Sequence, residues 1–576
     1  MKPAMVLRNR KNAAFKTIIF ILVFLLFSAV PYHLNSREGS APPADDIAKR
    51  YSSPREPSQK NKISKNNSIE TGYKYFKNYT YKDYDHQPQN WGMAQAENGL
   101  IYVANHGGVL EFDGVSWHII GIPGYATVRS LTIDEKGTIY IGGKGQIGFL
   151  TPGEKGTLHY HSLLGHLPDN RKTFSNVFKT YYAPGKGVYF HTSEFLFRWD
   201  GKQMKVWQPK ERFFFSFLCG GKLFIRRKTV GLMEMVNDSL RPVPGGDMFI
   251  TRHIFMMVPY DSEKILIGTG TKGFYLYDGT AIIPFPTEVD DYLKKNKLFN
   301  GTRLSSGDFA LTTLHGGIVI ITPHGRLKYI FDKTSGLQDN KIYHVLEDKQ
   351  GNLWLCLDKG ISKIEYSSPF FLYDDRSGLP GSVLSVVRHN DDLYAGTTNG
   401  LYVSRFPEKF RLIPGISSSC RCLLATKDAV LAATYEGVFH VRKNTGQNII
   451  KDRSFVLLPS EYYPGRIWCG TDKGLIALSR ANGRCVVEQR LETGNQEIRF
   501  IAEDKKGNLW LATSKGSVLK VDFPGDSDRP AVTWYGSSHG LPGGRVYAAR
   551  AAGHVLFATE KGIFRFDEKN NIFIAD

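Results

Sequence analysis

Two cysteines separated by one residue, Cys420 and Cys422, are the first residues whose types could support metal or redox chemistry. Residues two apart in an extended strand face the same side, so we expect both thiols on one face. None of the six cysteines forms a CxxC motif or a Cys/His zinc pattern. Cys356 and Cys469 lie in apolar runs, where a thiol packs as a small apolar group. We therefore predict no metal site and no cofactor.

Three further patterns superficially resemble catalytic motifs. His159 and His161 could form a metal pair, but a hydrogen-bonded surface pair is the favoured interpretation. The GGDMF segment at Gly245 resembles a cyclase signature but lacks the metal-binding acidic residue, so we expect a turn. Asp348 and Asp504 recur at one position of a repeated segment, which favours a hairpin-capping role over catalysis. Because no other catalytic motif is present, we predict no catalytic residue and no enzyme activity in this chain.

A repeated segment must position whatever site the chain has. The segment DKQGNLWLCLDKGISKI, beginning at Asp348, recurs as DKKGNLWLATSKGSVLKV, beginning at Asp504. Weaker copies lie between them, and the spacing corresponds to about 39 residues per unit. Looser copies begin at Ile101 and continue through the N-terminal half, for twelve units in all.

Each unit predicts a small antiparallel sheet. An alternating apolar run, a glycine-containing turn that needs positive φ, and a second alternating run describe a hairpin. Four short strands in about 40 residues make one propeller blade. We therefore predict an all-β chain with two tandem β-propellers of about twelve four-stranded blades, following an N-terminal apolar helix. Seven blades would occupy residues 73–376 and five would occupy residues 377–576, although a division into six and six stays open.

The N-terminus has the pattern of an export signal. Five basic residues and no acidic residue precede the uncharged run TIIFILVFLLFSAV at residues 17–30. Residues 1–34 are therefore predicted to be a signal peptide or an uncleaved signal anchor, which would place the rest of the chain outside the cytoplasm. Residues 35–72 are polar and poor in apolar side chains, which predicts a disordered linker.

The units resemble the two-component regulator propeller repeats, whose pattern is roughly GL…V…D..G.LW.GT..GL. The segment Ser335–Ile364 follows this pattern closely, as do the segments that begin at Ser377 and Gly540. The resemblance implies the periplasmic sensor region of a hybrid histidine kinase-type receptor. Such receptors usually continue into a tyrosine-containing domain, a transmembrane helix and an output domain. We expect a receptor that lacks this C-terminal part, or one that is split over two chains.

Polar residues recur where a propeller opens onto its central channel. In these repeats, that place is the loop just before the inner strand of each blade. In five of the first seven units, this loop supplies the residues that we predict to bind ligand: Asn90, Arg129, Asn176, Arg252 and Asn340. Converging polar groups suit a hydroxyl-rich or anionic ligand. The alternative is that they only satisfy backbone groups of the loops. Three tryptophans could stack on a sugar or pack between blades: Trp91, Trp117 and Trp534.

The sequence favours a periplasmic or extracellular sensor that is secreted or anchored to the cytoplasmic membrane through its N-terminal segment. Its ligand would be a small polar molecule such as an oligosaccharide, and its partners a second copy of the chain or a separate kinase or transcription regulator. The formal charge of +19 is spread without a basic stripe, so nucleic acid is not an expected partner. The alternatives are an exported propeller lyase or glycoside hydrolase, and a scaffold for protein partners.

Overall fold

The computed structural model describes residues 72–576, except residues 154–155, 210–211, 482–483, 495 and 524–529. The described chain forms two compact units, which meet in the sequence between Ser377 and Gly378. Every sheet has four strands, and all strand pairs are antiparallel. The predicted all-β fold of twelve four-stranded blades is confirmed. Seven of the sheets lie in the first unit and five in the second.

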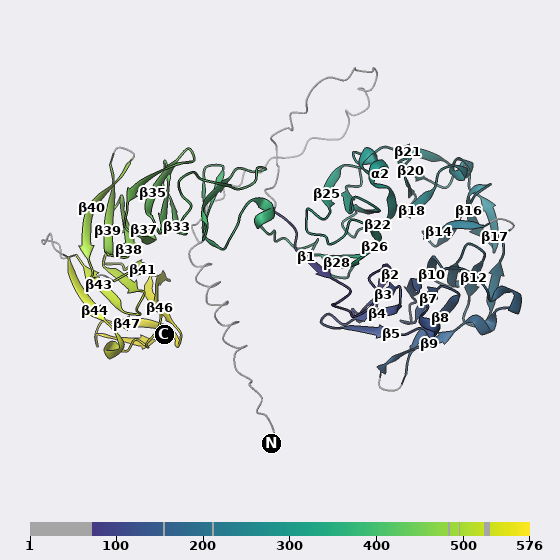
Figure 1. Cartoon of the computed structure of the whole chain (residues 1–576), viewed down its shortest axis with the longest axis horizontal. Helices are drawn as coiled ribbons and strands as arrows, with labels where there is room; N and C mark the ends of the chain where they lie inside the picture. Colours follow the sequence, from purple (N-terminus) through teal and green to yellow (C-terminus); the bar gives the residue numbers. More distant parts are fainter. Residues whose placement is uncertain (1–71, 154–155, 210–211, 482–483, 495, 524–529) are drawn as a thin grey trace, which may run out of the picture. The chain divides into compact units, whose positions relative to one another are not determined.

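The first unit contains seven sheets arranged around a common centre (Figure 1). Its helical segments are η1 (Pro123–Tyr125), η3 (Leu164–His166), η4 (Asp169–Arg171), η5 (Gly246–Ile250), α2 (Asp290–Asn296) and η6 (Asp375–Ser377). Its strands are β1 (Phe76–Tyr79), β2 (Asn90–Gln95), β3 (Ile101–Asn105), β4 (Gly108–Phe112), β5 (Trp117–Ile120), β6 (Val128–Ile133), β7 (Ile139–Gly143), β8 (Gln146–Pro152), β9 (Leu158–Ser162), β10 (Lys179–Ala183), β11 (Gly187–His191), β12 (Leu196–Trp199), β13 (Met204–Trp207), β14 (Phe213–Cys219), β15 (Lys222–Arg227), β16 (Gly231–Val236), β17 (Ser239–Pro242), β18 (Ile254–Pro259), β19 (Ile265–Thr269), β20 (Phe274–Tyr277), β21 (Ile282–Phe285), β22 (Leu298–Arg303), β23 (Phe309–Thr313), β24 (Ile318–Ile321), β25 (Leu327–Phe331), β26 (Ile342–Glu347), β27 (Leu353–Leu357) and β28 (Gly360–Ile364).

The ring of the first unit closes through its N-terminal strand. Strand β1 pairs with β28, with Phe76 opposite Ile364 and Tyr79 opposite Ile361, so it becomes the outermost strand of the seventh blade. The inner strands β2 and β26 also pack against each other, which joins the first blade to the seventh. Residues from the two ends of the unit therefore share one sheet.

The second unit contains the remaining five sheets and η7 (Ser537–His539). Its inner strands pack in succession from β29 to β45. The end blades leave apolar side chains exposed, with Val383 and Val386 on β29 and Ile563 on β47. The strands are β29 (Val383–His389), β30 (Asp392–Thr397), β31 (Gly400–Ser404), β32 (Arg411–Leu412), β33 (Cys420–Ala425), β34 (Val430–Thr434), β35 (Gly437–Arg442), β36 (Thr445–Ile450), β37 (Ser454–Pro459), β38 (Arg466–Thr471), β39 (Gly474–Ala481), β40 (Arg484–Glu492), β41 (Ile498–Glu503), β42 (Leu509–Thr513), β43 (Val518–Asp522), β44 (Ala531–Tyr535), β45 (Tyr547–Ala551), β46 (His554–Thr559), β47 (Gly562–Asp567) and β48 (Ile572–Ala575).

The glycine of the repeated hairpin has the backbone conformation that the sequence predicts. Gly437 has a φ of 125°, and a Cβ atom placed there would lie 1.7 Å from the carbonyl oxygen of Ile450. Glycine is required at this position because any side chain would collide with the neighbouring strand.

The repeated aspartate caps the turn before the tryptophan strand, as predicted. Asp348 Oδ1 accepts hydrogen bonds from the backbone N–H groups of Gln350 (2.9 Å) and Asn352 (2.8 Å). Its Oδ2 accepts a bond from Trp354 Nε1 at 2.9 Å. Asp504 makes the same set of contacts, including one from Trp510 Nε1 at 3.3 Å. One carboxylate thus fixes both the turn and the buried indole.

Replacing this aspartate should destabilise the first unit. Asp348→Ala removes the turn bonds and leaves a buried indole N–H without an acceptor, which costs about 1–3 kcal/mol for the unsatisfied donor. Asp134→Ala is the matched control, because Asp134 accepts the equivalent backbone bonds at 3.0 and 2.8 Å, but the residue at the tryptophan position is Tyr140, which has no indole. We expect urea unfolding to show a larger loss for Asp348→Ala than for Asp134→Ala. Equal losses would contradict the role given to the indole bond.

The expected common face of Cys420 and Cys422 is wrong. A register shift between these residues leaves Arg421 as an extra, bulged residue. The bulge changes the alternation, so Cys420 and Cys422 pack into different hydrophobic clusters on the two faces of the sheet. A shared metal or redox site at this pair is therefore excluded.

The structure does not test the predicted N-terminal segments. The leader at residues 1–34, with its apolar helix, and all but the last residue of the linker at residues 35–72 lie outside the described residues. Among the described residues, no helix combines the length and apolar character needed to cross a bilayer.

Candidate ligand site at the channel mouth of the first unit

One position at the start of the inner strand recurs in each of the seven blades of the first unit. In six blades, the strand pairing shifts register around this residue, which marks it as a β-bulge. In the third blade, the equivalent residue directly precedes β10 and donates its N–H to the carbonyl of His191. A bulge redirects a side chain out of the regular alternation. The seven residues, which we call the mouth ring, are Trp91, Arg129, Phe178, Phe214, Phe255, Phe299 and Tyr343.

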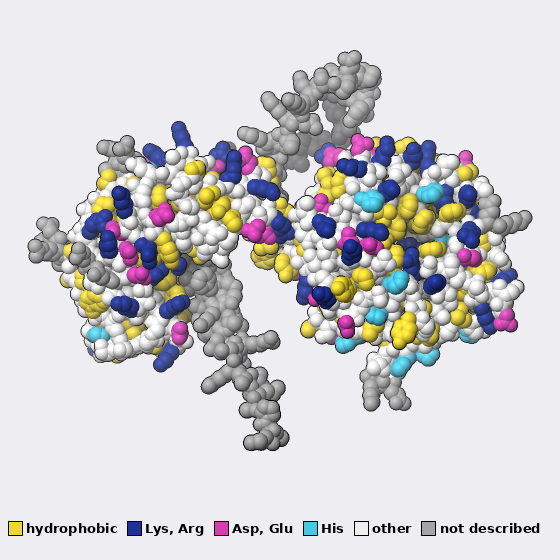
Figure 2. Space-filling model, viewed as in Figure 1, with side chains coloured by type: hydrophobic (Ala, Val, Ile, Leu, Met, Phe, Trp, Pro, Cys, Tyr) yellow, Lys and Arg dark blue, Asp and Glu magenta, His cyan; other side chains and the backbone are white. Residues whose placement is uncertain are grey.

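Members of the mouth ring contact one another across blade boundaries. The guanidinium carbon of Arg129 lies 3.4 Å from the ring centroid of Trp91, and the Trp91 and Tyr343 rings are stacked at 4.3 Å. Tyr343 meets Phe299 edge to face at 5.6 Å, and Phe299 lies 5.9 Å from Phe255. Since these residues come from different blades, their side chains must converge toward the common centre. Figure 2 shows hydrophobic side chains at the centre of this unit, with basic side chains and histidines beside them.

The mouth ring has one polar edge, at Tyr343, whose own ring is 6% exposed and stacked on Trp91. Tyr343 Oη donates to Asp358 Oδ1 at 2.7 Å, and Gln89 Nε2 and Lys341 Nζ reach the same oxygen at 2.9 and 3.4 Å. Burial raises the pKa of Asp358, but the bonds from Tyr343 and Gln89 outweigh it, so that pKa lies below its ordinary value. Burial and the bond to Asp358 raise the pKa of Tyr343. Tyr343 is therefore a neutral hydrogen-bond donor.

Asn90 does not lie on an open surface. It is completely buried, and its side-chain N–H₂ donates to the carbonyls of Pro88 and Gly360, both at 3.0 Å. Its Oδ1 accepts a bond from Asn105 at 2.9 Å. Asn90 thus joins the first blade to the seventh, and this arrangement corresponds to the alternative interpretation, in which it satisfies loop backbone groups.

Of the other four predicted residues, one belongs to the mouth ring and three bond to neighbouring residues outside it. Arg129 belongs to the mouth ring, where it stacks on Trp91. Arg252 donates to Tyr275 Oη at 3.1 Å, and Asn176 forms an isolated backbone bridge with Lys144. Asn340 Oδ1 accepts the N–H of Lys333 at 2.8 Å. The structure therefore brings only Arg129 into the ring, and ligand binding by all five residues stays a prediction.

Sequence reasoning missed most of the mouth ring. Trp91 was considered for stacking, but Phe178, Phe214, Phe255 and Phe299 were not. The available signal was an aromatic residue directly after a buried residue at the start of the inner strand in six of the seven blades, as in Ile254-Phe255 and Leu298-Phe299. This pattern departs from simple alternation, so it is recognisable only once the bulges are known.

A hollow of about 470 Å³ lies at the opposite ends of three inner strands of the first unit. This volume falls within the usual range of about 300–1,000 Å³ for ligand pockets. However, its lining includes no aromatic ring, and its carboxylate, Glu347, is already bonded to the N–H and Oγ of Ser305 at 2.7 and 2.6 Å. Its lining residues are Val258, Pro259, Thr302, Arg303, Leu304, Ser305, Gly307 and Glu347.

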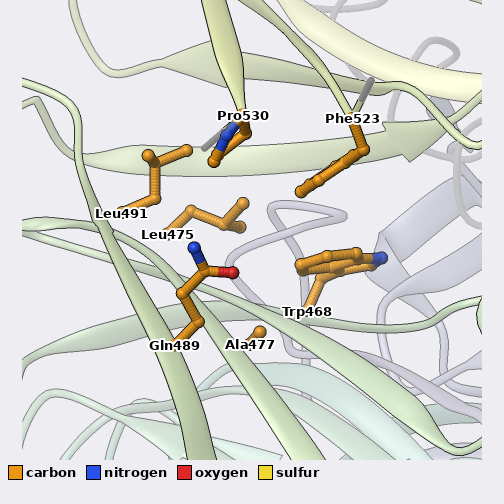
Figure 3. Close-up of a pocket in the computed structure, with 7 residues that line it drawn as sticks. All are labelled: Trp468, Leu475, Ala477, Gln489, Leu491, Phe523 and Pro530. Carbon is orange, nitrogen blue, oxygen red and sulfur yellow. The ribbon is translucent and has the colours of Figure 1, made fainter. Parts of the chain in front are cut away.

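The second unit has a small apolar cavity between blades. Figure 3 shows the rings of Trp468 and Phe523 on one side, Leu475 near the middle and the Gln489 amide directed inward. The two aromatic rings are stacked at 5.3 Å. The cavity measures about 10 Å³, which is room for one water at most. It is therefore a packing defect and too small for a ligand.

No cluster of metal-binding side chains occurs in residues 72–576 outside the gaps noted above. His159 Nε2 lies 3.1 Å from Thr157 Oγ1, and His161 stacks on Phe149 at 5.4 Å, so the two histidines have separate neighbours. Cys356 and Cys469 are completely buried, as predicted, and burial raises the pKa of both thiols. These groups supply packing.

The comparisons with known proteins agree with this architecture. Residues 336–359 and 493–515 match the family model described as two component regulator propeller. The matched segments contain the two aspartate turns and the tryptophan strands β27 and β42. The chain therefore carries repeats of the two component regulator propeller family. A search of curated proteins found no match.

The fold also matches solved propeller structures. The extracellular domain of the hybrid two component system BT3049 from B. thetaiotaomicron aligns with 87% of this chain and 72% of that chain, at 18% identity and a TM-score of 0.66. At this identity, the likeness shows the fold. Two other structures score too low to support an argument. The extracellular domain of the one component system BT4673 from B. thetaiotaomicron covers 87% of this chain and 73% of that chain (15% identity, TM-score 0.42). Virginiamycin B lyase from Staphylococcus aureus covers 50% and 98% (13% identity, TM-score 0.40).

Proposed function

We propose that the chain is an extracytoplasmic ligand-binding module of a two-component-type signalling receptor, and that it senses a carbohydrate or another polar ligand. The observation that supports this proposal most strongly is the mouth ring, in which one position of seven blades supplies six aromatic residues and Arg129. Stacked aromatic faces bind sugar rings, and the polar edge at Tyr343 and Asp358 supplies hydrogen bonds to hydroxyl groups. The family repeats and the extracellular relative BT3049 favour the same assignment.

The remaining parts of the receptor belong to this proposal. The apolar run at residues 17–30 would export the chain and anchor it to the cytoplasmic membrane. Ligand binding would change how two copies of the chain pack in a dimer, or how the chain contacts a separate kinase or transcription regulator. Either change would pass the signal on. Binding without turnover separates this function from that of an exported lyase or glycoside hydrolase.

A screen of the full chain against a panel of oligosaccharides tests the proposal. We expect at least one glycan to bind with saturable heat in calorimetry and to be recovered unchanged after prolonged incubation. Cleavage of the bound glycan would favour the enzyme alternative. Failure of every glycan to bind would contradict a carbohydrate sensor.

A further inference from the structure

Lys179, on the inner strand of the third blade, has no counter-ion among the described residues. It begins β10, directly after Phe178 of the mouth ring, and it is half-buried. Among the described residues, its side-chain nitrogen forms neither an ion pair nor a hydrogen bond. Burial lowers the pKa of this amine. Cations removed from water are normally paired with an anion. Lys179 therefore presents an unmet requirement for negative charge.

The charge of Lys179 acts on groups from opposite sides of the ring. It lowers the pKa of His191, its cross-strand partner in the third blade, and of His344 in the seventh blade. It also acts on the Cys356 thiol, which pairs with His344 across β26 and β27. Lys179 and His344 occupy the same position of their inner strands, directly after Phe178 and Tyr343, in blades that are not neighbours. This shared position places the ammonium group toward the channel that the inner strands enclose.

The two histidines cannot neutralise this charge. Burial, and then the Lys179 charge, lower the pKa of both His191 and His344 to about 3. Both rings are therefore neutral across physiological pH. His191 is completely buried, and neither ring nitrogen has a partner. His344 Nδ1 lies 3.2 Å from Asn300 Nδ2, which is a neutral partner. The carboxylate of Glu194 also acts on His191, but it is bonded to Ser175 Oγ at 2.7 Å.

Two arginines add positive charge near the mouth ring. Arg226 is 1% exposed, donates to the carbonyls of Phe249 and Ile250 at 2.8 and 2.7 Å, and retains a buried Nη1 without a partner. Its guanidinium lies 5.2 Å from the Phe214 ring. For Arg129, the structure records the stack on Trp91 and no carboxylate partner among the described residues. The three cations outnumber the two carboxylates identified near them, and both carboxylates are already bonded: Asp358 to Tyr343 at 2.7 Å and Glu194 to Ser175 at 2.7 Å.

We propose that the channel of the first unit is a carboxylate-binding site centred on Lys179, which makes the ligand an acidic saccharide. Its sugar ring would lie on the mouth ring, and its carboxylate would pass inward to the ammonium group. Uronic acids have this chemistry, because they carry a carboxylate on a hydroxyl-rich ring. This inference rests on the proposed function and specifies its ligand class.

The test compares D-glucuronate with D-glucose, which differ by one carboxylate. We expect the full chain to bind glucuronate at least about tenfold more tightly than glucose in titration calorimetry. A charge-assisted hydrogen bond between the carboxylate and Lys179 accounts for a difference of this size. Lys179→Met should remove that preference and leave glucose binding unchanged, whereas Lys136→Met, at an exposed turn, should change neither. Lys179→Met should also melt no lower than the wild type, because it removes an unpaired charge. If it fails to fold, Lys179→Gln replaces it.

Three results would overturn the inference. They are no glucuronate binding, equal binding of the two sugars by the wild type, and an undiminished glucuronate preference in Lys179→Met. If neutral glycans from the panel still bind, the sensor function stands and only the acidic ligand class is rejected.

Discussion

We expect Tyr79→Ala to lower the free energy of unfolding of the first unit by about 3–5 kcal/mol, the usual cost of truncating a buried aromatic residue. Tyr79 ends β1 and is 7% exposed. Its ring is stacked on Trp354 at 5.8 Å and meets Phe112 and Trp117 edge to face at 5.5 and 5.3 Å. The substitution therefore weakens the seam that joins the N-terminal strand to the seventh blade.

Hydrogen exchange measures this effect where it should be largest. Amides of β3 and β27 should exchange faster in Tyr79→Ala, because both strands contribute to the hydrophobic cluster that holds Tyr79. Tyr75→Ala is the matched control, since Tyr75 precedes β1 and is 50% exposed. If the amides of β3 and β27 exchange at the same rate in both variants, the claim that Tyr79 holds the ring closed is wrong.

The fold could be predicted because its signal is repeated. Twelve copies of an alternating pattern, eleven of them with a glycine at the hairpin turn, determine four-stranded blades without knowledge of long-range contacts. The closing strand could not be predicted in the same way. FKNY at Phe76–Tyr79 is too short to give a pattern of its own, and its pairing with β28 joins residues that are far apart in the sequence.

The site was only partly predictable for a related reason. Arg129 and Trp91 could be selected by residue type, but the ring they form depends on a bulge at the start of each inner strand. A bulge adds one residue and reverses the later alternation, which is also why the faces of Cys420 and Cys422 were mispredicted. Lys179 was missed because nothing local distinguishes it from a surface lysine.

The second large effect concerns ligand binding. We expect Trp91→Ala to weaken the binding of the tightest glycan of the panel about 30-fold, or about 2 kcal/mol. This is the value of roughly 80 Å² of apolar contact at about 25 cal/mol per Å². Trp91 is a central member of the mouth ring, because it contacts both Arg129 and Tyr343. The measurement is a calorimetric titration of the full chain.

Trp534→Ala is the control for a general loss of aromatic surface. Trp534 is 44% exposed in the second unit and was an equal candidate for stacking from sequence alone. We expect Trp534→Ala to bind the glycan as the wild type does, and both variants to keep their melting temperatures within a few degrees. A loss of affinity in Trp534→Ala with none in Trp91→Ala would move the site to the second unit.

The central claim is that the ligand lies on the mouth ring of the first unit. A crystal structure of the full chain with its tightest glycan tests this claim most directly. We predict density for a sugar ring over the mouth ring, within reach of Arg129. Density in the hollow beside Glu347, or on the second unit with the mouth ring empty, would contradict the account.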